Sequence, residues 1–337
     1  PGFGMASGLS PRQILRWTSL LAGARAHAFL QRPARPGGHH LHAHFAARGA
    51  VGANVMSRAW GVPYSMTVHA YDLFLPNPRL PALTLGAALV VAISEYDRQE
   101  LLRLVPAADP ERITVIHAGV PVDELRAGGP GPQRPARERP LVVSVGRLVP
   151  KKGMDVLVRA VALLARDGIP VSCEIIGDGG ERPRLEALIR KLGVEALVTL
   201  RGELLPAEAR FRIAEADLFA LACVRAPNGD MDGIPVALME GMAVGTPVVS
   251  TRLSGIPELV TDDENGLLVE PGDPTYLAAA IRRLLDDRPF AHGLAVSAAR
   301  TIADRFDQDA NARLLLASIT QARAAGPPGR LSPTGRP

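Results

Sequence analysis

One stretch of the sequence decides the fold: residues 142–160 read VVSVGRLVPKKGMDVLVRA. A short apolar run ends at Gly146, a basic turn follows, and Lys152-Gly153 opens a segment with helical spacing of apolar residues. The same alternation of apolar run and amphipathic helix continues on both sides of this stretch. Nearly continuous apolar strands between helices predict parallel sheets with both faces covered, because each crossover places a helix on a face.

The alternation predicts two groups of strands with a break between them. Strands are expected at 40–45, 64–70, 88–94 and 113–119, and again from near residues 141, 171, 198, 217, 247 and 266. Helices are expected at 46–60, 81–87, 95–105, 275–285, 288–303 and 309–324, with further helical segments between the later strands. We therefore expect an α/β protein of two Rossmann-like domains (1–126 and 141–305), a linker of Gly, Pro and Arg (127–140), a C-terminal helix (306–325) and a disordered tail (326–337).

Composition excludes several classes of protein. With 337 residues, 47% hydrophobic and 21% charged, the chain is too apolar to be disordered and too long for one ordinary domain. Cys173 and Cys223 lie in apolar runs, which predicts buried thiols in a reducing cytoplasm. The longest uncharged apolar stretch, 80–94, carries Pro and Gly and is shorter than the ~18–20 residues of a membrane span.

The basic turn is the first candidate site. Arg147 and Lys152 flank a strand-to-helix loop, where a helix N-terminus also favours negative charge. A diphosphate would find a guanidinium, an ammonium and backbone N–H groups together there. The alternative is a solvated basic turn.

A pair of acids forms the second candidate site. In DMDGIPVALMEGMAVGTPVVST, seven residues separate Asp232 from Glu240. Pro235 suits the first turn of a helix, which would place Asp232 at its N-terminus with the N–H groups of Gly233 and Ile234 open to an anion or a sugar hydroxyl. The alternative is that Asp232 only caps the helix. Glu240 lies within a mostly apolar helix and needs a partner, which ribose hydroxyls would supply.

These motifs, in this order, resemble family 4 glycosyltransferases of GT-B fold. The resemblance rests on GRLVPKKG, IIGDGGERPRLEALIRKLGV, VTLRGELLPAE, DGIPVALMEGMAVGTPVVST, SGIPELV and NGLLVEPGD in the second half, and on TVHAYDLF in the first. Together with TVHAYDLF, the segment HAHFA is similar to the subgroup of colanic acid and exopolysaccharide enzymes. The resemblance covers roughly residues 41–306.

The resemblance implies a retaining glycosyltransferase with two Rossmann-like domains facing a cleft. It would move a sugar from a nucleotide-sugar donor to a saccharide or lipid-linked acceptor in polysaccharide or cell-envelope glycan synthesis. The resemblance implies no metal or other cofactor.

The resemblance also implies roles for individual residues. They are Arg147 and Lys152 for the donor diphosphate, Glu240 for the donor ribose, Asp232 with Gly233, Ile234 and Pro235 for the transferred sugar, Gly202, Glu203 and Leu204 near the base, and His69 beside sugar and acceptor. His69 is expected to position groups and stabilise charge, not to act as a general base. Asp72, close behind it, is expected to cap a turn or helix.

Two departures from the family pattern bear on function. Asp232 stands where the family has glutamate, so its side chain is one methylene shorter. Nothing before Leu41 resembles the family's first strand and Gly-rich turn, so we expect the first domain to be incomplete. The alternative function is a truncated, catalytically silent nucleotide-binding module. A sugar-nucleotide epimerase on the same fold lacks support from the second half.

The start of the chain leaves further alternatives open. His40, His42 and His44 alternate on one face of a strand, which suggests a metal site, but no cysteine or acid lies near them. No acid precedes Asp72 whereas seven arginines do, yet without interleaved aromatics this does not indicate nucleic-acid binding. The basic surface is either a solvated face or a contact with anionic lipids, the latter supported by apolar residues beside arginine in 11–30.

Overall fold

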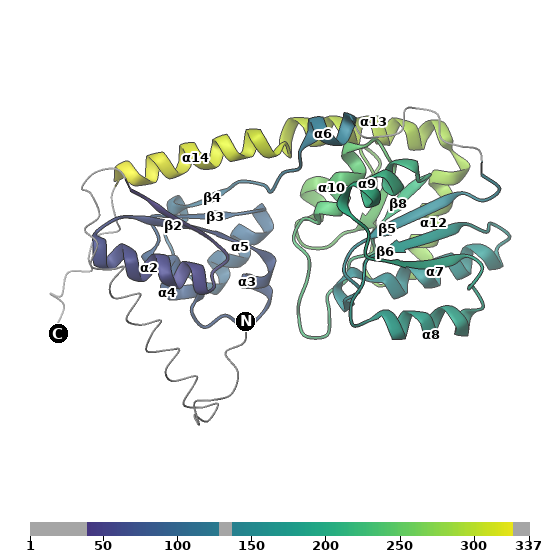
Figure 1. The fold of residues 1–337 in the computed structure, drawn as a ribbon, viewed down its shortest axis with the longest axis horizontal. Coiled ribbons are helices and arrows are strands. Elements are labelled where there is room, and N and C mark those ends of the chain that lie inside the picture. The colour runs from purple at the N-terminus through teal and green to yellow at the C-terminus, as the bar shows by residue number, and fades with distance from the viewer. Residues whose placement is uncertain (1–38, 128–136, 326–337) are drawn as a thin grey trace, which may run out of the picture.

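The computed structural model describes residues 39–127 and 137–325, and these form two parallel β-sheets (Figure 1). The strand orders are β1-β2-β3-β4 and β10-β9-β8-β5-β6-β7. This confirms the predicted α/β class with two parallel-sheet domains. The expected membrane-facing segment, the centre of the expected linker and the expected tail lie outside the described residues. Within the described ranges, no helix is long and apolar enough to cross a membrane.

The first sheet alternates with short helices along the chain. Its strands are β1 (Leu41–His44), β2 (Tyr64–Val68), β3 (Leu89–Ala92) and β4 (Ile113–Val115). The helical segments are α2 (Arg48–Trp60), α3 (Ala70–Phe74), α4 (Leu80–Gly86), α5 (Glu95–Leu104), the 3-10 turn η1 (Pro110–Arg112) and α6 (Val122–Ala127). Every residue of β2 and β3 is buried, as expected for strands covered on both faces.

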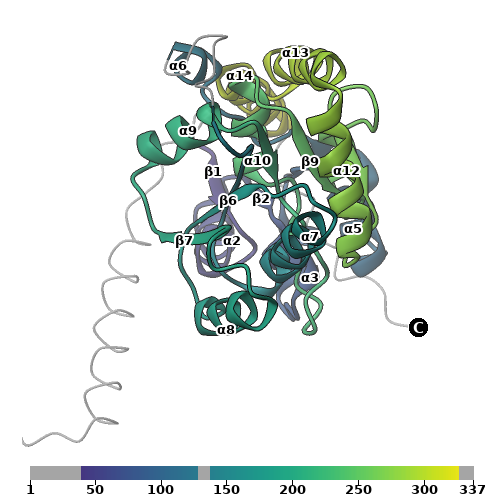
Figure 2. The same ribbon diagram turned by 90° about the vertical axis from the view of Figure 1, so that its right-hand side faces the viewer.

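The second sheet is larger and carries helices on both faces. Its strands are β5 (Leu141–Val145), β6 (Ser172–Ile176), β7 (Val198–Gly202), β8 (Leu218–Ala220), β9 (Val248–Thr251) and β10 (Leu267–Val269). Its helical segments are η2 (Pro150–Lys152), α7 (Met154–Arg166), α8 (Arg182–Leu192), α9 (Pro206–Glu215), α10 (Val236–Ala243), α11 (Ile256–Leu259), α12 (Pro274–Asp286) and α13 (Arg288–Arg305). Helices α8, α7 and α12 lie side by side on one face (Figure 2), and α9, α10 and α13 pack together on the other.

Every expected strand is present, and most are a few residues shorter than predicted. The strand expected over 113–119 ends at Val115, although the Ile116 N–H still donates to the Ala92 carbonyl of β3 at 3.0 Å and Ile116 packs in the same cluster as Leu89 and Val91 of that strand. Helices α3 and α6 were not predicted. The helix expected to include Pro235 begins at Val236, so that prediction is wrong by one residue. Both cysteines are buried and unpaired, as predicted.

The last helix, α14 (Gln308–Ala325), returns from the second domain to the first and lies along the top of the molecule in Figure 1. Three of its apolar side chains pack on the first sheet in one small cluster. That cluster consists of Leu315, Ile319 and Ala322 against Leu89, Val91 and Ile116. The C-terminal helix therefore completes the core of the first domain, a packing that its sequence position alone does not indicate.

The two connections between the domains are hydrogen-bonded to each other. The Val120 N–H donates to the Phe306 carbonyl at 2.9 Å, and the Gln308 N–H donates to the Val120 carbonyl at 3.1 Å. A Cβ at Gly119 would lie 2.5 Å from the Gln308 Cα. Only glycine at position 119 therefore allows these two segments of the chain to approach this closely.

We predict that Gly119→Ala forces this crossing apart and lowers the free energy of unfolding by about 1–3 kcal/mol, the usual cost of overpacking. Denaturant unfolding measures the change. The control is Gly293→Ala on the exposed side of α13, where an added Cβ meets nothing within 4 Å. That change should be neutral or stabilise by about 0.5–1 kcal/mol, because alanine favours helix. Equal stability of the two variants would contradict the role of Gly119.

Candidate functional site

The candidate residues gather at the carboxyl ends of strands in both domains. Arg147 follows β5, Gly202 ends β7, and His69 follows β2. In parallel α/β sheets this edge is where ligands bind. The two domains meet at the turn before α10, because a Cβ at Gly233 would lie 3.5 Å from the Ile93 Cδ1 and 3.8 Å from the Ala70 Cβ.

The basic turn after β5 is pressed against the loop after β8. Arg147 is exposed, and η2 leads into Gly153, the N-cap of α7, which has a φ of 61°. A Cβ at Gly153 would lie 1.8 Å from the Ala222 carbonyl oxygen, so both backbone angle and space require glycine. The Val224 N–H donates to the Lys151 carbonyl at 2.9 Å, which fixes the two segments together.

Two lysines of this turn pair with two aspartates of the loop after β8. Lys152 Nζ lies 2.6 Å from Asp232 Oδ2. Lys151 Nζ lies 3.0 Å from Asp230 Oδ1 and 3.5 Å from Asp232 Oδ1. It also donates to the Met231 carbonyl at 3.3 Å, and its side chain is only 9% exposed. We call these four side chains the Lys–Asp cluster.

The charge of Asp232 is set by this cluster. Burial by itself raises the pKa of Asp232, but the ammonium groups of Lys152 and Lys151 outweigh burial and hold the pKa below its usual value. The carboxylate is therefore ionised at neutral pH. Asp232 lies before α10 and pairs with lysines, so both the expected N-terminal position and the capping alternative are wrong. Lys152 as a diphosphate ligand stays a prediction.

Two residues of the cluster, Lys151 and Asp230, are not among the predicted site residues. Lys151 is one of only three lysines in the chain, yet nothing local assigns it a partner. The complementary patterns Lys-Lys and Asp-x-Asp carry a signal, but their pairing joins positions 79 residues apart. Only the fold brings them together.

Glu240 has a protein partner, so the expectation that ribose hydroxyls must supply one is wrong. Arg210 on α9 donates through Nε to Glu240 Oε1 at 3.0 Å, and the Glu240 side chain is 17% exposed. The acid within the apolar helix α10 is thus paired without a ribose. A role for Glu240 in donor binding stays a prediction.

The three residues expected near the base differ in what they present. Gly202 has a φ of 74°, and its carbonyl accepts the Gly177 N–H at 2.8 Å. Glu203 is exposed, whereas Leu204 packs against the core of the second domain. Of these three, Glu203 alone offers a polar side chain to a ligand.

His69 caps α3 and lies among aromatic rings. The backbone N–H of His69 donates to Asp72 Oδ2 at 3.0 Å, and the backbone N–H of Asp72 donates to the His69 carbonyl at 2.8 Å. These bonds confirm Asp72 as a helix cap. The His69 ring stacks on Phe45 with centroids 4.2 Å apart, and its Nε2 lies 3.4 Å from His44 Nδ1. Burial, together with His44, lowers the pKa of His69 to about 4. The imidazole is therefore neutral at neutral pH and supplies hydrogen bonds without a positive charge.

His42 in β1 and His40 just before it bind hydroxyl groups of β2. His40 Nε2 and His42 Nδ1 each lie 2.7 Å from Ser65 Oγ, and His42 Nε2 lies 3.1 Å from Thr67 Oγ1. Burial and the neighbouring histidines lower the pKa of His42 to about 4. In the described part of the chain, no group of three or more His, Cys, Asp or Glu side chains is placed to hold a metal ion.

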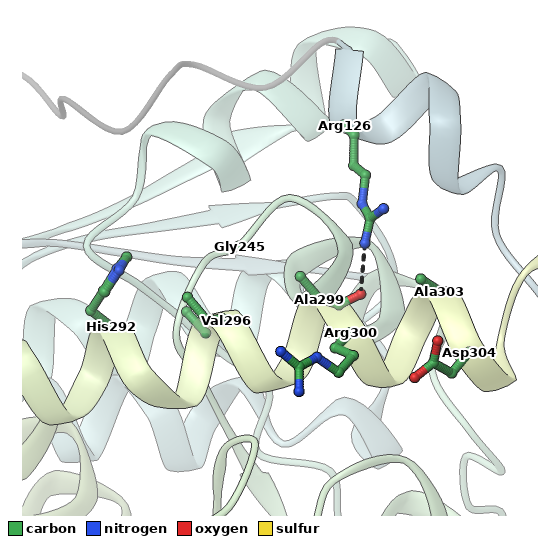
Figure 3. Close-up of a pocket in the computed structure, with 9 residues that line it drawn as sticks. Arg126, Gly245, His292, Val296, Ala299, Arg300, Ala303 and Asp304 are labelled. Atoms are coloured by element: carbon green, nitrogen blue, oxygen red, sulfur yellow. Dashed lines mark hydrogen bonds between the residues drawn. The ribbon is translucent and has the colours of Figure 1, made fainter.

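A separate hollow of about 540 Å³ lies between α6 and α13 (Figure 3). Arg126 reaches from α6 to donate to the Ala299 carbonyl at 3.1 Å, while His292, Arg300 and Asp304 line the hollow from α13. No residue of the candidate site lines this hollow.

The structure is an α/β protein of GT-B fold. It has two parallel-sheet domains that contact each other at the turn before α10, and a basic strand-to-helix turn lies beside this contact. The chain belongs to the family described as glycosyl transferases group 1, whose model matches residues 131–301. A second family model, Glycosyltransferase Family 4, matches residues 9–124.

The chain is similar to biosynthetic glycosyltransferases of bacteria. It is 42% identical over 169 residues to the putative colanic acid biosynthesis glycosyltransferase WcaL of Escherichia coli K12, covering 50% of this chain and 41% of that protein. It is 34% identical over 229 residues to the amylovoran biosynthesis glycosyltransferase AmsK of Erwinia amylovora, covering 68% and 55%. The chain thus spans about half the length of these relatives.

Among solved structures, the fold is similar to Anabaena Alr3699/HepE in complex with UDP. The TM-score is 0.72 at 21% identity, covering 90% of this chain and 82% of that one. At this identity the likeness shows the fold alone.

We predict that Lys151→Met destabilises the protein by about 1–3 kcal/mol at pH 7, because Asp230 loses its ammonium partner and Asp232 keeps only Lys152. Lys191→Met, at the third and exposed lysine, is the control and should change stability by less than about 0.5 kcal/mol. The lysines hold the pKa of Asp232 below its usual value of 3.8. The difference in stability between the two variants should therefore persist above pH 3.8 and narrow only as the pH falls below it and the carboxyl takes up its proton. Denaturant unfolding at several pH values measures this, and equal stability at pH 7 would contradict it.

Proposed function

We propose that this chain is part of a retaining glycosyltransferase that acts in exopolysaccharide synthesis. It would move a sugar from a nucleotide-sugar donor to a saccharide or lipid-linked acceptor. The observation that carries the proposal is the Lys–Asp cluster at the carboxyl ends of β5 and β8, beside the N-terminus of α7. Family membership and the names of the relatives support it, as does the UDP bound to HepE.

In this proposal the second domain holds the donor diphosphate without a metal ion. Arg147 offers an exposed guanidinium and Lys152 an ammonium, and both flank the turn that leads into α7. Fixed cations and helix N–H groups stabilise the negative charge that develops on a leaving diphosphate. Glu240 would bind the ribose, and the turn from Asp232 to Pro235 would contact the sugar.

The proposed reaction keeps the configuration of the sugar. The bond between the anomeric carbon and the phosphate oxygen breaks, and the acceptor oxygen bonds to that carbon on the same face. The acceptor proton passes to the departing phosphate oxygen, so no protein base is required. His69, neutral at neutral pH, would orient the sugar or the acceptor by hydrogen bonding.

A donor screen tests the proposal. The full chain should bind one of UDP-glucose, UDP-galactose and GDP-mannose, and Glu240→Ala should weaken that binding about tenfold or more, the value of a hydrogen bond to a charged group. Arg210→Ala is the matched control, because it breaks the same ion pair but keeps the carboxylate. Calorimetry measures both. If no sugar nucleotide binds, or if the two variants bind equally well, the donor assignment fails. Binding without any sugar transfer by the complete protein would favour the silent nucleotide-binding module.

The pH dependence of transfer tests the role of His69. Because the pKa of His69 is about 4, we predict no inflection from this residue near pH 6.5, where an ordinary histidine titrates. His69→Ala should slow transfer about tenfold or more, and His69→Gln, which keeps a hydrogen-bonding group, should restore part of the rate. If instead the rate falls as the pH is lowered through about 6.5, and this fall is absent in His69→Gln, His69 is a general base.

A further inference from the structure

A carboxylate of the second domain caps a helix of the first. Glu258 on α11 accepts the Glu95 N–H through Oε2 at 2.8 Å and the Tyr96 N–H through Oε1 at 2.9 Å. These are the first two amides of α5, which have no acceptor within their own helix. A negative charge at a helix N-terminus is also favoured by the helix dipole. Glu258 therefore closes the start of α5 from more than one hundred and sixty residues away along the chain.

Neighbouring groups complete this contact. Ser94, the N-cap of α5, accepts the Asp97 N–H through Oγ at 3.0 Å. His117 Nε2 lies 3.3 Å from Glu258 Oε2. Burial by itself raises the pKa of Glu258, but the hydrogen bonds from His117 and from the two amides outweigh it and lower the pKa. The docked carboxylate is thus ionised at neutral pH.

Asp97 shows that the contact is tight and disfavours a second charge. Its side chain is fully buried, and neither carboxyl oxygen has a hydrogen-bond partner in the described structure. A Cβ at Gly233, across the domain boundary, would lie 3.6 Å from Asp97 Oδ2. Burial, and then the charge of Glu258, raise the pKa of Asp97 to about 7. Below that pH the interface carries its negative charge on Glu258 while Asp97 stays protonated.

The same contact holds together the two halves of the candidate site, which are the turn carrying Asp232 in the second domain and the helix capped by His69 in the first. A Cβ at Gly255, at the start of α11, would lie 3.0 Å from Ile234 Cγ1 and 3.0 Å from Ser94 Cβ, so α11 is wedged between the turn before α10 and the start of α5. Ala70, the residue after His69, would lie 3.8 Å from a Cβ at Gly233. Docking of Glu258 on α5 therefore sets where the Asp232 turn lies relative to the helix that His69 caps.

We propose that Glu258 is a positioning residue for sugar transfer, which holds the turn carrying Asp232 against the helix capped by His69. The inference rests on the proposed function, because the half-sites that it joins are those assigned to the donor and to the acceptor side. Both oxygens of Glu258 are already bound by α5 amides, so its effect passes through the arrangement of the domains. Removing the carboxylate should leave donor binding, which lies within the second domain, nearly unchanged and should slow transfer.

Amide hydrogen exchange of the full chain tests the docking contact without any ligand. In Glu258→Ala, the amides of Glu95 and Tyr96 should exchange about tenfold faster or more, because their charged acceptor is gone. Glu258→Gln keeps a carbonyl acceptor and should lie between wild type and Glu258→Ala. The control, Glu264→Ala, removes an exposed acid close by in the same domain and should leave these amides unchanged. Unchanged exchange in Glu258→Ala would overturn the proposal.

Kinetics of the same variants test the positioning role. With whichever of UDP-glucose, UDP-galactose and GDP-mannose the wild type uses, Glu258→Ala should keep its donor Kd within about twofold and lose about tenfold or more in kcat. Glu258→Gln should recover part of kcat, and it also serves if Glu258→Ala does not fold. An unchanged kcat, or a loss confined to donor Kd, would overturn the positioning role. If the wild type uses none of these donors, the proposed function fails and the positioning role with it, whereas the exchange experiment still decides whether Glu258 docks on α5.

Discussion

The Lys–Asp cluster is the interaction on which the rest of the candidate site depends. Buried charges are costly unless each finds a partner, so a cluster of this kind tolerates few other arrangements of its backbone. Lys151 spans Asp230, Asp232 and the Met231 carbonyl, and so joins the turn after β5 to the loop after β8. Lys152 then meets Asp232 from the same turn. The loop continues directly into the turn before α10, so the position of that turn follows from the ion pairs.

His117 connects the two features that join the domains. Its ring lies 4.8 Å from that of Phe306, and its carbonyl accepts the Asn311 side-chain amide at 3.0 Å, both at the crossing between the connections. Its Nε2 contacts Glu258, which caps α5. The crossing of the two connections and the docked carboxylate of Glu258 therefore both contact His117, which lies beyond the end of β4. With α14 packed on that sheet, the first domain is held to the second by chain connection, apolar packing and charge together.

Patterns within one segment of the sequence predicted most of the fold, because the spacing of apolar residues depends only on local geometry. The strands, the long helices and the carboxyl-end placement of Arg147 followed from that spacing. The partners did not, because a polar residue on a helix face looks the same whether it meets solvent or an acid from another element. Arg210 reads as a solvated residue of α9, yet it pairs with Glu240 thirty residues away. Glu258 similarly reads as an ordinary acid in the first turn of α11. Charge pairing between distant segments needs the fold, and here it decided the chemistry of the site.

The ion pair between Asp232 and Lys152 would couple donor binding to the availability of the Asp232 carboxylate. In the structure its carboxylate lies 2.6 Å from the Lys152 ammonium, which is also the proposed ligand of the donor diphosphate. A diphosphate has more charge and more acceptor oxygens than one carboxylate, so under the proposed function it would compete with Asp232 for Lys152. Under the proposed function, donor binding would then loosen Asp232 from Lys152 while Lys151 still restrains its loop. The carboxylate would become available to the sugar only after the diphosphate is in place. Binding energy from the diphosphate would thereby be used to arrange the reacting end of the donor, which is how remote contacts favour a transition state.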